Sequence, residues 1–298
     1  MNIWFIIAVD GVVFASWLFL ISVGMTLIYG VLRILNVAHG SLYALGAYTG
    51  ASLIIAYFRH DLWPYGSYLA LFGAALLVGV IAGPLIERGL LRWVYDRDPA
   101  VQLLVTYALF LILEDAIKLG WGADPYYAYK PYQLLGQVQL GGIAYPRYSF
   151  LLLGIALAAG GALWLFINRT RFGKLIVAVI EDPEISTAMG VNVPRVYVIT
   201  FTLGAVLAAL GGAFTAPMIS VAPGIAVEVI VLAFAVVVIG GLGSLEGAAL
   251  GALIVGLVRA AAVHHIPDLE LFAIYLVMAA VLLVRPQGLF AREERRRI

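Results

Sequence analysis

Nine long apolar stretches constrain the fold of this chain more than any other feature of its sequence. A helix needs about 20 apolar residues to cross the roughly 30 Å hydrocarbon core of a bilayer. The stretches lack the alternation of apolar and polar residues that is typical of a membrane β-barrel. The sequence therefore predicts an all-α, polytopic membrane protein with about nine membrane-embedded helices (eight to ten), forming a single domain over residues 1–298. The predicted spans lie near residues 11–32, 38–58, 66–87, 100–120, 149–168, 195–217, 226–242, 247–263 and 269–285.

Composition excludes several other classes of protein. Hydrophobic residues make up 63% of the chain and charged residues only 12%, whereas soluble domains contain about 25% charged residues. There is no cysteine, which excludes disulfides, thiolate catalysis and cysteine-ligated metals. The formal net charge of +1 gives no basis for nucleic-acid binding, so the expected surroundings are membrane lipid and protein partners.

The distribution of lysine and arginine predicts an orientation in the membrane. With nine spans, 13 of these residues fall in the loops on one side and 5 on the other. Because basic loops are retained in the cytoplasm, we expect the N-terminus outside and the C-terminus inside, with a basic cytoplasmic tail at 286–298. The segment Ile3–Val9 is too short to span alone and ends at Asp10, so we expect an interfacial lead-in that precedes the first span.

Two connections are too long to be simple turns. The external loop 121–148 is rich in tyrosine and proline. It is either an aromatic belt at the membrane interface or a docking surface for an external partner. The second connection is a cytoplasmic segment at 169–195.

Part of the cytoplasmic segment is predicted to form an isolated short helix. Asp182 can cap its N-terminus, Pro183 suits the first helical position and Glu184 favours the positive end of the helix dipole. Gly190 is a natural C-terminal stop, after Ala188 and Met189. The helix is either an amphipathic connector on the membrane surface or a compact element that inserts into a groove on a cytoplasmic partner.

Four motifs, in order and spanning residues 36 to 290, resemble one known family. They are Asn36-Val-Ala-His39-Gly-Ser41-Leu-Tyr43-Ala-Leu-Gly-Ala-Tyr48, Ala188-Met189-Gly190-Val191, Ile239-Gly240-Gly241-Leu-Gly243-Ser244-Leu-Glu-Gly247, and Arg285-Pro-Gln-Gly-Leu-Phe290. Together they are similar to branched-chain amino acid ABC transporter permeases of the LivH type. The resemblance implies that the second motif, with its upstream acidic residues, belongs to the loop that couples a permease to its ATPase. The implied coupling residues are Asp182, Pro183, Glu184, Ala188, Met189 and Gly190.

The resemblance also implies partners and a location. It implies one permease subunit of a bacterial inner-membrane importer, with a paralogous second permease, two cytoplasmic ATPase subunits and a periplasmic substrate-binding protein. The chain contains no G-x-x-x-x-G-K-[ST] motif, so ATP and Mg would be used by the partner ATPases, and we expect no cofactor on this chain.

Interrupted helices and buried charges indicate where a substrate path could lie. The stretch after residue 224 is short and broken by glycines, and a polar break precedes the second span; such breaks favour polar cavities within a membrane. Glu114 and Asp115 lie within the fourth span, where Glu114 either pairs with Lys118 or, like Asp115, meets a substrate ammonium. The predicted path residues are Asn36, His39, Ser41, Tyr43, Thr106, Glu114, Glu228, Gly240, Gly241, Gly243 and Ser244. No histidines have metal-ligand spacing and no nucleophile–base arrangement occurs, so we expect neither a metal site nor an enzyme.

These observations predict an ABC permease that imports amino acids, branched-chain or otherwise apolar, by alternating access. A urea or short-amide permease of the same family shares the motifs. An ion-coupled secondary transporter is the alternative from another class, and it would have no use for the short cytoplasmic helix.

Overall fold

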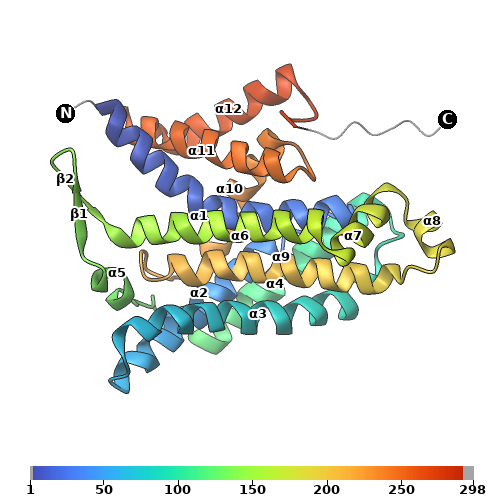
Figure 1. Ribbon diagram of the computed structural model, residues 1–298, viewed down its shortest axis with the longest axis horizontal. Helices are drawn as coiled ribbons and strands as arrows, with labels where there is room; N and C mark the ends of the chain where they lie inside the picture. The colour runs from blue at the N-terminus through green and yellow to red at the C-terminus, as the bar shows by residue number, and fades with distance from the viewer. Residues whose placement is uncertain (1–2, 291–298) are drawn as a thin grey trace.

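The computed structural model describes residues 3–290, and the helices in this range run mostly along one axis (Figure 1). The first half of the described range contains α1 (Ile3–Leu32), α2 (His39–Arg59), η1 (Pro64–Gly66), α3 (Ser67–Gly89), η2 (Leu91–Trp93), α4 (Pro99–Trp121), α5 (Lys130–Leu134), β1 (Gln137–Leu140) and β2 (Ile143–Pro146). The second half contains α6 (Arg147–Arg169), α7 (Arg171–Glu181), α8 (Pro183–Ala188), α9 (Val193–Thr215), α10 (Ile225–Gly240), α11 (Leu245–His265), η3 (Pro267–Leu269) and α12 (Glu270–Val284).

The described helices confirm a polytopic, all-α membrane protein. Eight of them are long and apolar enough to cross a bilayer, and the helix predicted near 226–242 is present as the shorter α10. Among the described residues, strands occur as an antiparallel hairpin in the predicted external loop, where Val138 pairs with Tyr145. The end of the predicted basic tail, residues 291–298, lies outside the described residues, so the orientation that depends partly on it stays a prediction.

The predicted lead-in at the N-terminus is continuous with the first span. Ile3–Val9 is the first part of one continuous helix, α1, that extends to Leu32. Asp10 lies within this helix, and its Oδ2 lies 2.7 Å from Nε2 of His264 at the end of α11.

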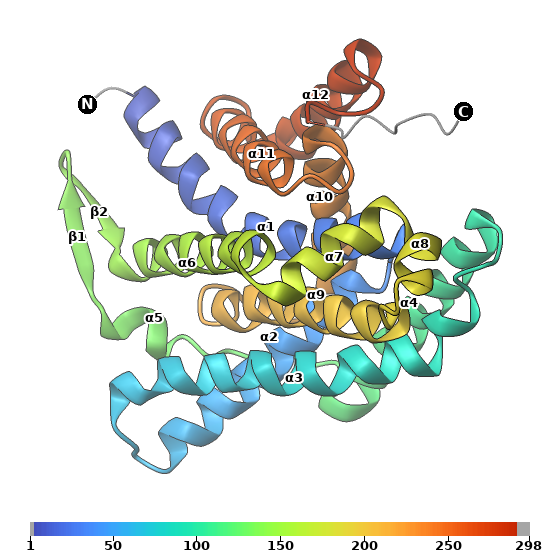
Figure 2. The same cartoon turned by 45° about the vertical axis from the view of Figure 1, so that its right-hand side comes forward.

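Helix α9 lies at the centre of the bundle, against α1, α2 and α3 (Figure 2). Small residues allow this close packing. A Cβ added at Gly79 of α3 would lie 2.3 Å from the Val206 side chain, and one added at Gly46 of α2 would lie 2.3 Å from the Ala209 carbonyl oxygen. The glycines spaced four apart in the sequence therefore serve helix packing at these positions.

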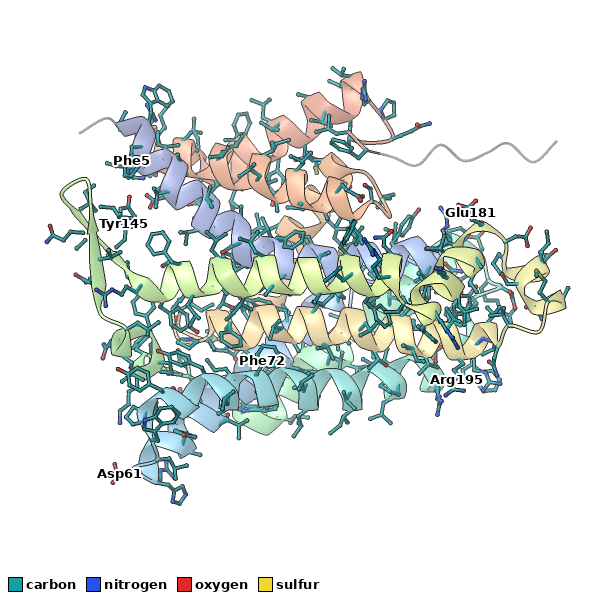
Figure 3. The ribbon with its side chains drawn as sticks, viewed as in Figure 1. Phe5, Asp61, Phe72, Tyr145, Glu181 and Arg195 are labelled. Carbon is teal, nitrogen blue, oxygen red and sulfur yellow. The ribbon has the colours of Figure 1, made fainter. Side chains whose placement is uncertain are left out.

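The two ends of the bundle carry different elements. Figure 3 shows Glu181 and Arg195 at one end, beside α7 and α8, and Asp61 and Tyr145 at the opposite end. The hairpin and α5 lie at this second end (Figure 1). The predicted cytoplasmic segment and the predicted external loop are thus separated by the length of the bundle.

Candidate functional site: two interrupted helices and a short exposed helix

Helix α2 begins deep inside the bundle. Its first residue, His39, forms a 3.0 Å contact between Nε2 and the carbonyl oxygen of Ile21 in α1. Ile21 lies roughly 16 Å along α1 from Leu32, since an α-helix rises about 1.5 Å per residue. Residues 33–38 therefore return into the bundle without helical structure, after a reversal in which Arg33 has a φ of 58°.

Helix α10 begins beside the start of α2. Its N-cap, Gly224, has a φ of 93°, in the left-handed region that favours glycine. A Cβ added at Gly40 would lie 2.5 Å from the carbonyl oxygen of Ala226, so only glycine at position 40 allows the two helix starts to approach this closely. Two helices that begin next to each other inside a membrane bundle are an arrangement found at transport sites.

The polar residues at the start of α2 are buried within the chain. Asn36, His39, Ser41 and Tyr43 are each at most 2% exposed. The Asn36 amide, the Ser41 hydroxyl and His39 Nδ1 have no hydrogen-bond partner among the described residues. Unpaired polar atoms are costly to bury, so this cluster favours either bound water or a second conformation in which the atoms are hydrated.

Tyr43 and Thr106 have partners that connect separate elements. The Tyr43 hydroxyl lies 2.5 Å from Thr215 Oγ1 at the last residue of α9. The Thr106 hydroxyl of α4 lies 3.1 Å from the carbonyl oxygen of Leu35 and donates a hydrogen bond to it. These contacts connect the start of α2 to α9 and α4.

Glycines and a capping serine form the break between α10 and α11. Gly241 and Gly243 have φ values of 103° and 82°. A Cβ at Gly240 would lie 2.1 Å from the Gly247 carbonyl oxygen, and Ser244 Oγ accepts a hydrogen bond from Gly247 N at 3.0 Å. This break packs near Gly30 of α1, so it lies closer to the end of the bundle that carries α8 than the start of α2 does.

The C-terminal motif completes the end of α10. The backbone N–H groups of Leu289 and Phe290 donate to the carbonyl oxygens of Ile239 and Gly240, both at 2.9 Å. These carbonyls would otherwise be unpaired where the helix stops. In the sequence this motif supports only a family resemblance, and no local signal in it indicates that it returns to cap α10.

Glu114 connects α4 to the start of α10. Its Oε1 accepts a hydrogen bond from Gly224 N at 2.8 Å and lies 3.9 Å from the Lys118 ammonium. The predicted Glu114–Lys118 pair is therefore present, together with a backbone partner that the sequence did not indicate. Asp115 Oδ1 lies 3.6 Å from the same ammonium, and Glu228 is exposed on the first turn of α10.

Residues 121–148, the predicted external loop, lie over the start of α10. Tyr126 and Val221 exchange two backbone hydrogen bonds of 2.9 and 3.0 Å, which fix the loop to the segment that precedes α10. Burial raises the pKa of Tyr132 and Tyr145, and the Asp10 carboxylate raises that of Tyr145 further. Tyr127 and Tyr129 are exposed, so the loop has both an inward-packed and an outward-facing set of tyrosines.

Helix α8 has the predicted short form. The Asp182 carboxylate caps it by accepting from Glu184 N at 2.9 Å and Ile185 N at 3.0 Å, and Pro183 occupies the first position. Gly190 ends it with a φ of 86°. Ile185 and Met189 are 60% and 80% exposed, so this helix presents apolar side chains to the surroundings.

An amphipathic helix that the sequence analysis did not identify precedes α8. Helix α7 buries Ile176 and Val179 and exposes Arg171 and Lys174. Its periodicity was present in the sequence but is obscured by the apolar span before it. Together with the start of α9, it borders a groove of about 470 Å³ beside Met189.

Comparison with known proteins identifies the family. The family model described as the permease component of branched-chain amino acid transport systems matches residues 7–282. The chain belongs to this permease family. The permease is 29% identical to the high-affinity branched-chain amino acid permease protein BraD of Pseudomonas aeruginosa, over 96% of this chain and 95% of that protein. It is 28% identical to the corresponding LivH protein of Escherichia coli, over 96% of this chain and 94% of that protein.

The permease is a transport subunit and not an enzyme, as the resemblance of the four motifs implied. It is a multi-pass membrane protein, and its family works with ATPase and substrate-binding partners. Among solved structures, PsaBC from Streptococcus pneumoniae in complex with Fab has a similar chain, with a TM-score of 0.49 and 13% identity over 96% of this chain and 92% of that one.

Proposed function

We propose that this permease is half of the membrane channel of an ATP-driven importer in a bacterial inner membrane, and that it carries branched-chain or other apolar amino acids into the cytoplasm by alternating access. A paralogous second permease, two cytoplasmic ATPases and a periplasmic binding protein complete the assembly. ATP and Mg are bound by the ATPases.

The observation that carries this proposal is the exposed, capped helix α8. A short helix between two spans that presents Ile185 and Met189 outward is suited to insertion into a groove on a cytoplasmic protein. In a membrane protein that works alone, only lipid at the membrane surface could cover these apolar side chains.

The bundle offers a route from α8 to the interrupted helices. Three residues separate Met189 from Val193, the first residue of α9, and Asn192 caps that helix by accepting from Arg195 N at 3.0 Å. The last residue of α9, Thr215, contacts Tyr43 in α2. A displacement of α8 would therefore move α9 as a rod and reach the starts of α2 and α10.

In this proposal, the substrate path passes the two interrupted helices. Asn36, His39, Ser41, Tyr43 and Thr106 belong to its inner wall and become hydrated when the helices separate. Glu114 and Glu228 lie at its outer part, and Gly240, Gly241, Gly243 and Ser244 at its cytoplasmic part.

Co-purification tests the assignment of α8. The permease is co-expressed with its ATPases, and the ATPase retained on the tagged permease is measured. We expect Met189→Asp to lower retention at least about tenfold, because a carboxylate replaces a buried apolar contact. Gln139→Asp, at an exposed position in the hairpin at the other end of the bundle, should retain it.

Retention of the ATPase by both Met189→Asp and Gly190→Trp would overturn the role of α8. If the purified permease alone accumulated substrate in response to an ion gradient, it would be a secondary transporter. Competition by urea or acetamide, with no competition by amino acids, would instead identify an amide permease of the same family.

A further inference from the structure

The groove beside α8 has mainly apolar walls. It lies between α7 and the start of α9 and has a volume of about 470 Å³. Phe172 and Leu175 of α7 line one side, Val196 and Ile199 of α9 line the other, and residues 189–192 complete the lining. The volume falls within the range of about 300–1,000 Å³ that is typical of ligand sites. Such a groove favours an occupant with an apolar part.

The groove lies at the end of two helices that can cross a membrane. Helix α6 ends at Arg169 and α9 begins at Val193, and both are long and apolar enough to span a bilayer. Helix α7, between them in the sequence, has one buried apolar face and exposes Arg171 and Lys174. Basic amphipathic helices of this kind are typical of the membrane surface. The groove is therefore placed at the depth of lipid headgroups and the first part of their acyl chains.

Both walls of the groove carry an arginine one helical turn before an aliphatic side chain. Arg171 precedes Leu175 on α7, and Arg195, which lines the groove, precedes Ile199 on α9. One turn along a helix corresponds to about 6 Å. Neither arginine has an ion-pair partner among the residues that the structure describes. Glu181, at the end of α7, lies away from Arg195 (Figure 3).

We propose that this groove binds an anionic phospholipid of the surrounding membrane. The phosphate lies between Arg171 and Arg195, and an acyl chain follows the apolar walls past Leu175 and Ile199. Arginine suits this role because its guanidinium can donate two parallel hydrogen bonds to phosphate oxygens. Phosphatidylcholine offers the same acyl chain, but its trimethylammonium group opposes the two arginines. The groove therefore prefers phosphatidylglycerol to phosphatidylcholine.

The bound lipid also contacts the end of α8. Met189 and Gly190 are among the residues that line the groove, and residues 189–192 connect α8 to α9. Met189 is 80% exposed, which leaves room for contact with both a lipid and a cytoplasmic partner, and Ile185 does not line the groove. The lipid thus supports α8 from the membrane side while its outer face remains free for the ATPase.

The absence of cysteine allows a fluorophore to be placed in the groove. Leu175→Cys is introduced into the assembled transporter, labelled with bimane and reconstituted into phosphatidylcholine nanodiscs. These nanodiscs contain a fixed fraction of phosphatidylglycerol or phosphatidylcholine with brominated acyl chains, which quench a fluorophore in contact with them. Leu276→Cys, on the exposed surface of α12, is the matched control for ordinary lipid contact. We expect phosphatidylglycerol to associate at least about tenfold more strongly than phosphatidylcholine at Leu175→Cys, and equally at Leu276→Cys.

Charge variants test the role of the arginines. Arg171→Gln and Arg195→Gln should each lower the preference for phosphatidylglycerol about fivefold, because each removes one cation near the headgroup. Arg147→Gln, at an exposed position at the opposite end of the bundle, should not change it. Equal quenching by the two lipids at Leu175→Cys would overturn the proposal, as would a preference that survives when both arginines are replaced. Quenching by either lipid that appears only after the ATPases are removed would assign the groove to the ATPase instead. No quenching in either case would show that lipid does not enter it.

Discussion

Removing the segment that caps α10 should destabilise the permease. Truncation after Gln287 deletes the backbone donors of Leu289 and Phe290 and leaves the carbonyl oxygens of Ile239 and Gly240 without partners. Ile239 and Gly240 are both buried. Truncation after Phe290 is the matched control, because it removes only residues 291–298 and retains both hydrogen bonds.

The magnitude follows from the two lost hydrogen bonds. A buried polar group left unpaired costs about 1–3 kcal/mol, so the two carbonyls together cost about 2–6 kcal/mol. For a protein of this size, each kcal/mol lowers the melting temperature by about 2–4 °C. We expect the truncation after Gln287 to melt at least about 4 °C below the control.

The assay is the loss of monodisperse protein on size-exclusion chromatography after heating in detergent. Because such unfolding is irreversible, both truncations are heated at the same rate and compared with each other. Equal melting temperatures would refute the assignment of residues 288–290 as the cap of α10.

Three further predictions address other contacts. Gly40→Ala should sharply reduce the yield of folded protein, because the added Cβ would lie 2.5 Å from a backbone oxygen of α10. In the control Gly73→Ala, the added Cβ meets nothing within 4 Å, so this variant should fold normally. A normal yield for both variants would contradict the packing of α2 against α10. Arg259 and Glu270 form a 2.5 Å ion pair at the junction of α11 and α12. A double-mutant cycle that measures melting temperatures should give a coupling energy of about 1 kcal/mol between these two residues. Additive effects of the two single substitutions would show that the pair contributes nothing to stability. Asp182→Ala removes the cap of α8 and should destabilise that helix by about 1 kcal/mol, so less ATPase should be retained on the permease. Asp182→Asn keeps a capping side chain and should restore much of the retention. Equal retention by the unmodified permease and both variants would show that the cap does not matter.

The sequence could predict the spans because the physics behind them is local. Apolar length determines whether a helix crosses a bilayer, and all nine predicted helices are present. Helix α8 was predictable for the same reason, since Asp182, Pro183 and Gly190 act within a few residues of one another. The contact between Asp10 of α1 and His264 could not be predicted in the same way, because the two residues are 254 positions apart.

The contacts of the candidate site could not be predicted because they depend on tertiary structure. Nothing near Glu114 in the sequence indicates that it binds Gly224 N, and nothing near Leu289 indicates that its N–H pairs with Ile239. Nothing in the sequence indicates that Gly40 lies against Ala226 of α10. The sequence shows which charged, polar and glycine residues are unusual for a membrane helix, and the fold determines which of them contact one another.

ATP-dependent uptake by the reconstituted complex tests the central claim most directly. Proteoliposomes containing this permease, its sister permease and the ATPases are supplied with the binding protein, labelled L-leucine and internal ATP-Mg. We predict accumulation that requires hydrolysable ATP and that Met189→Asp abolishes. Accumulation by this permease without the ATPases, or uptake that persists in the absence of ATP, would contradict the account.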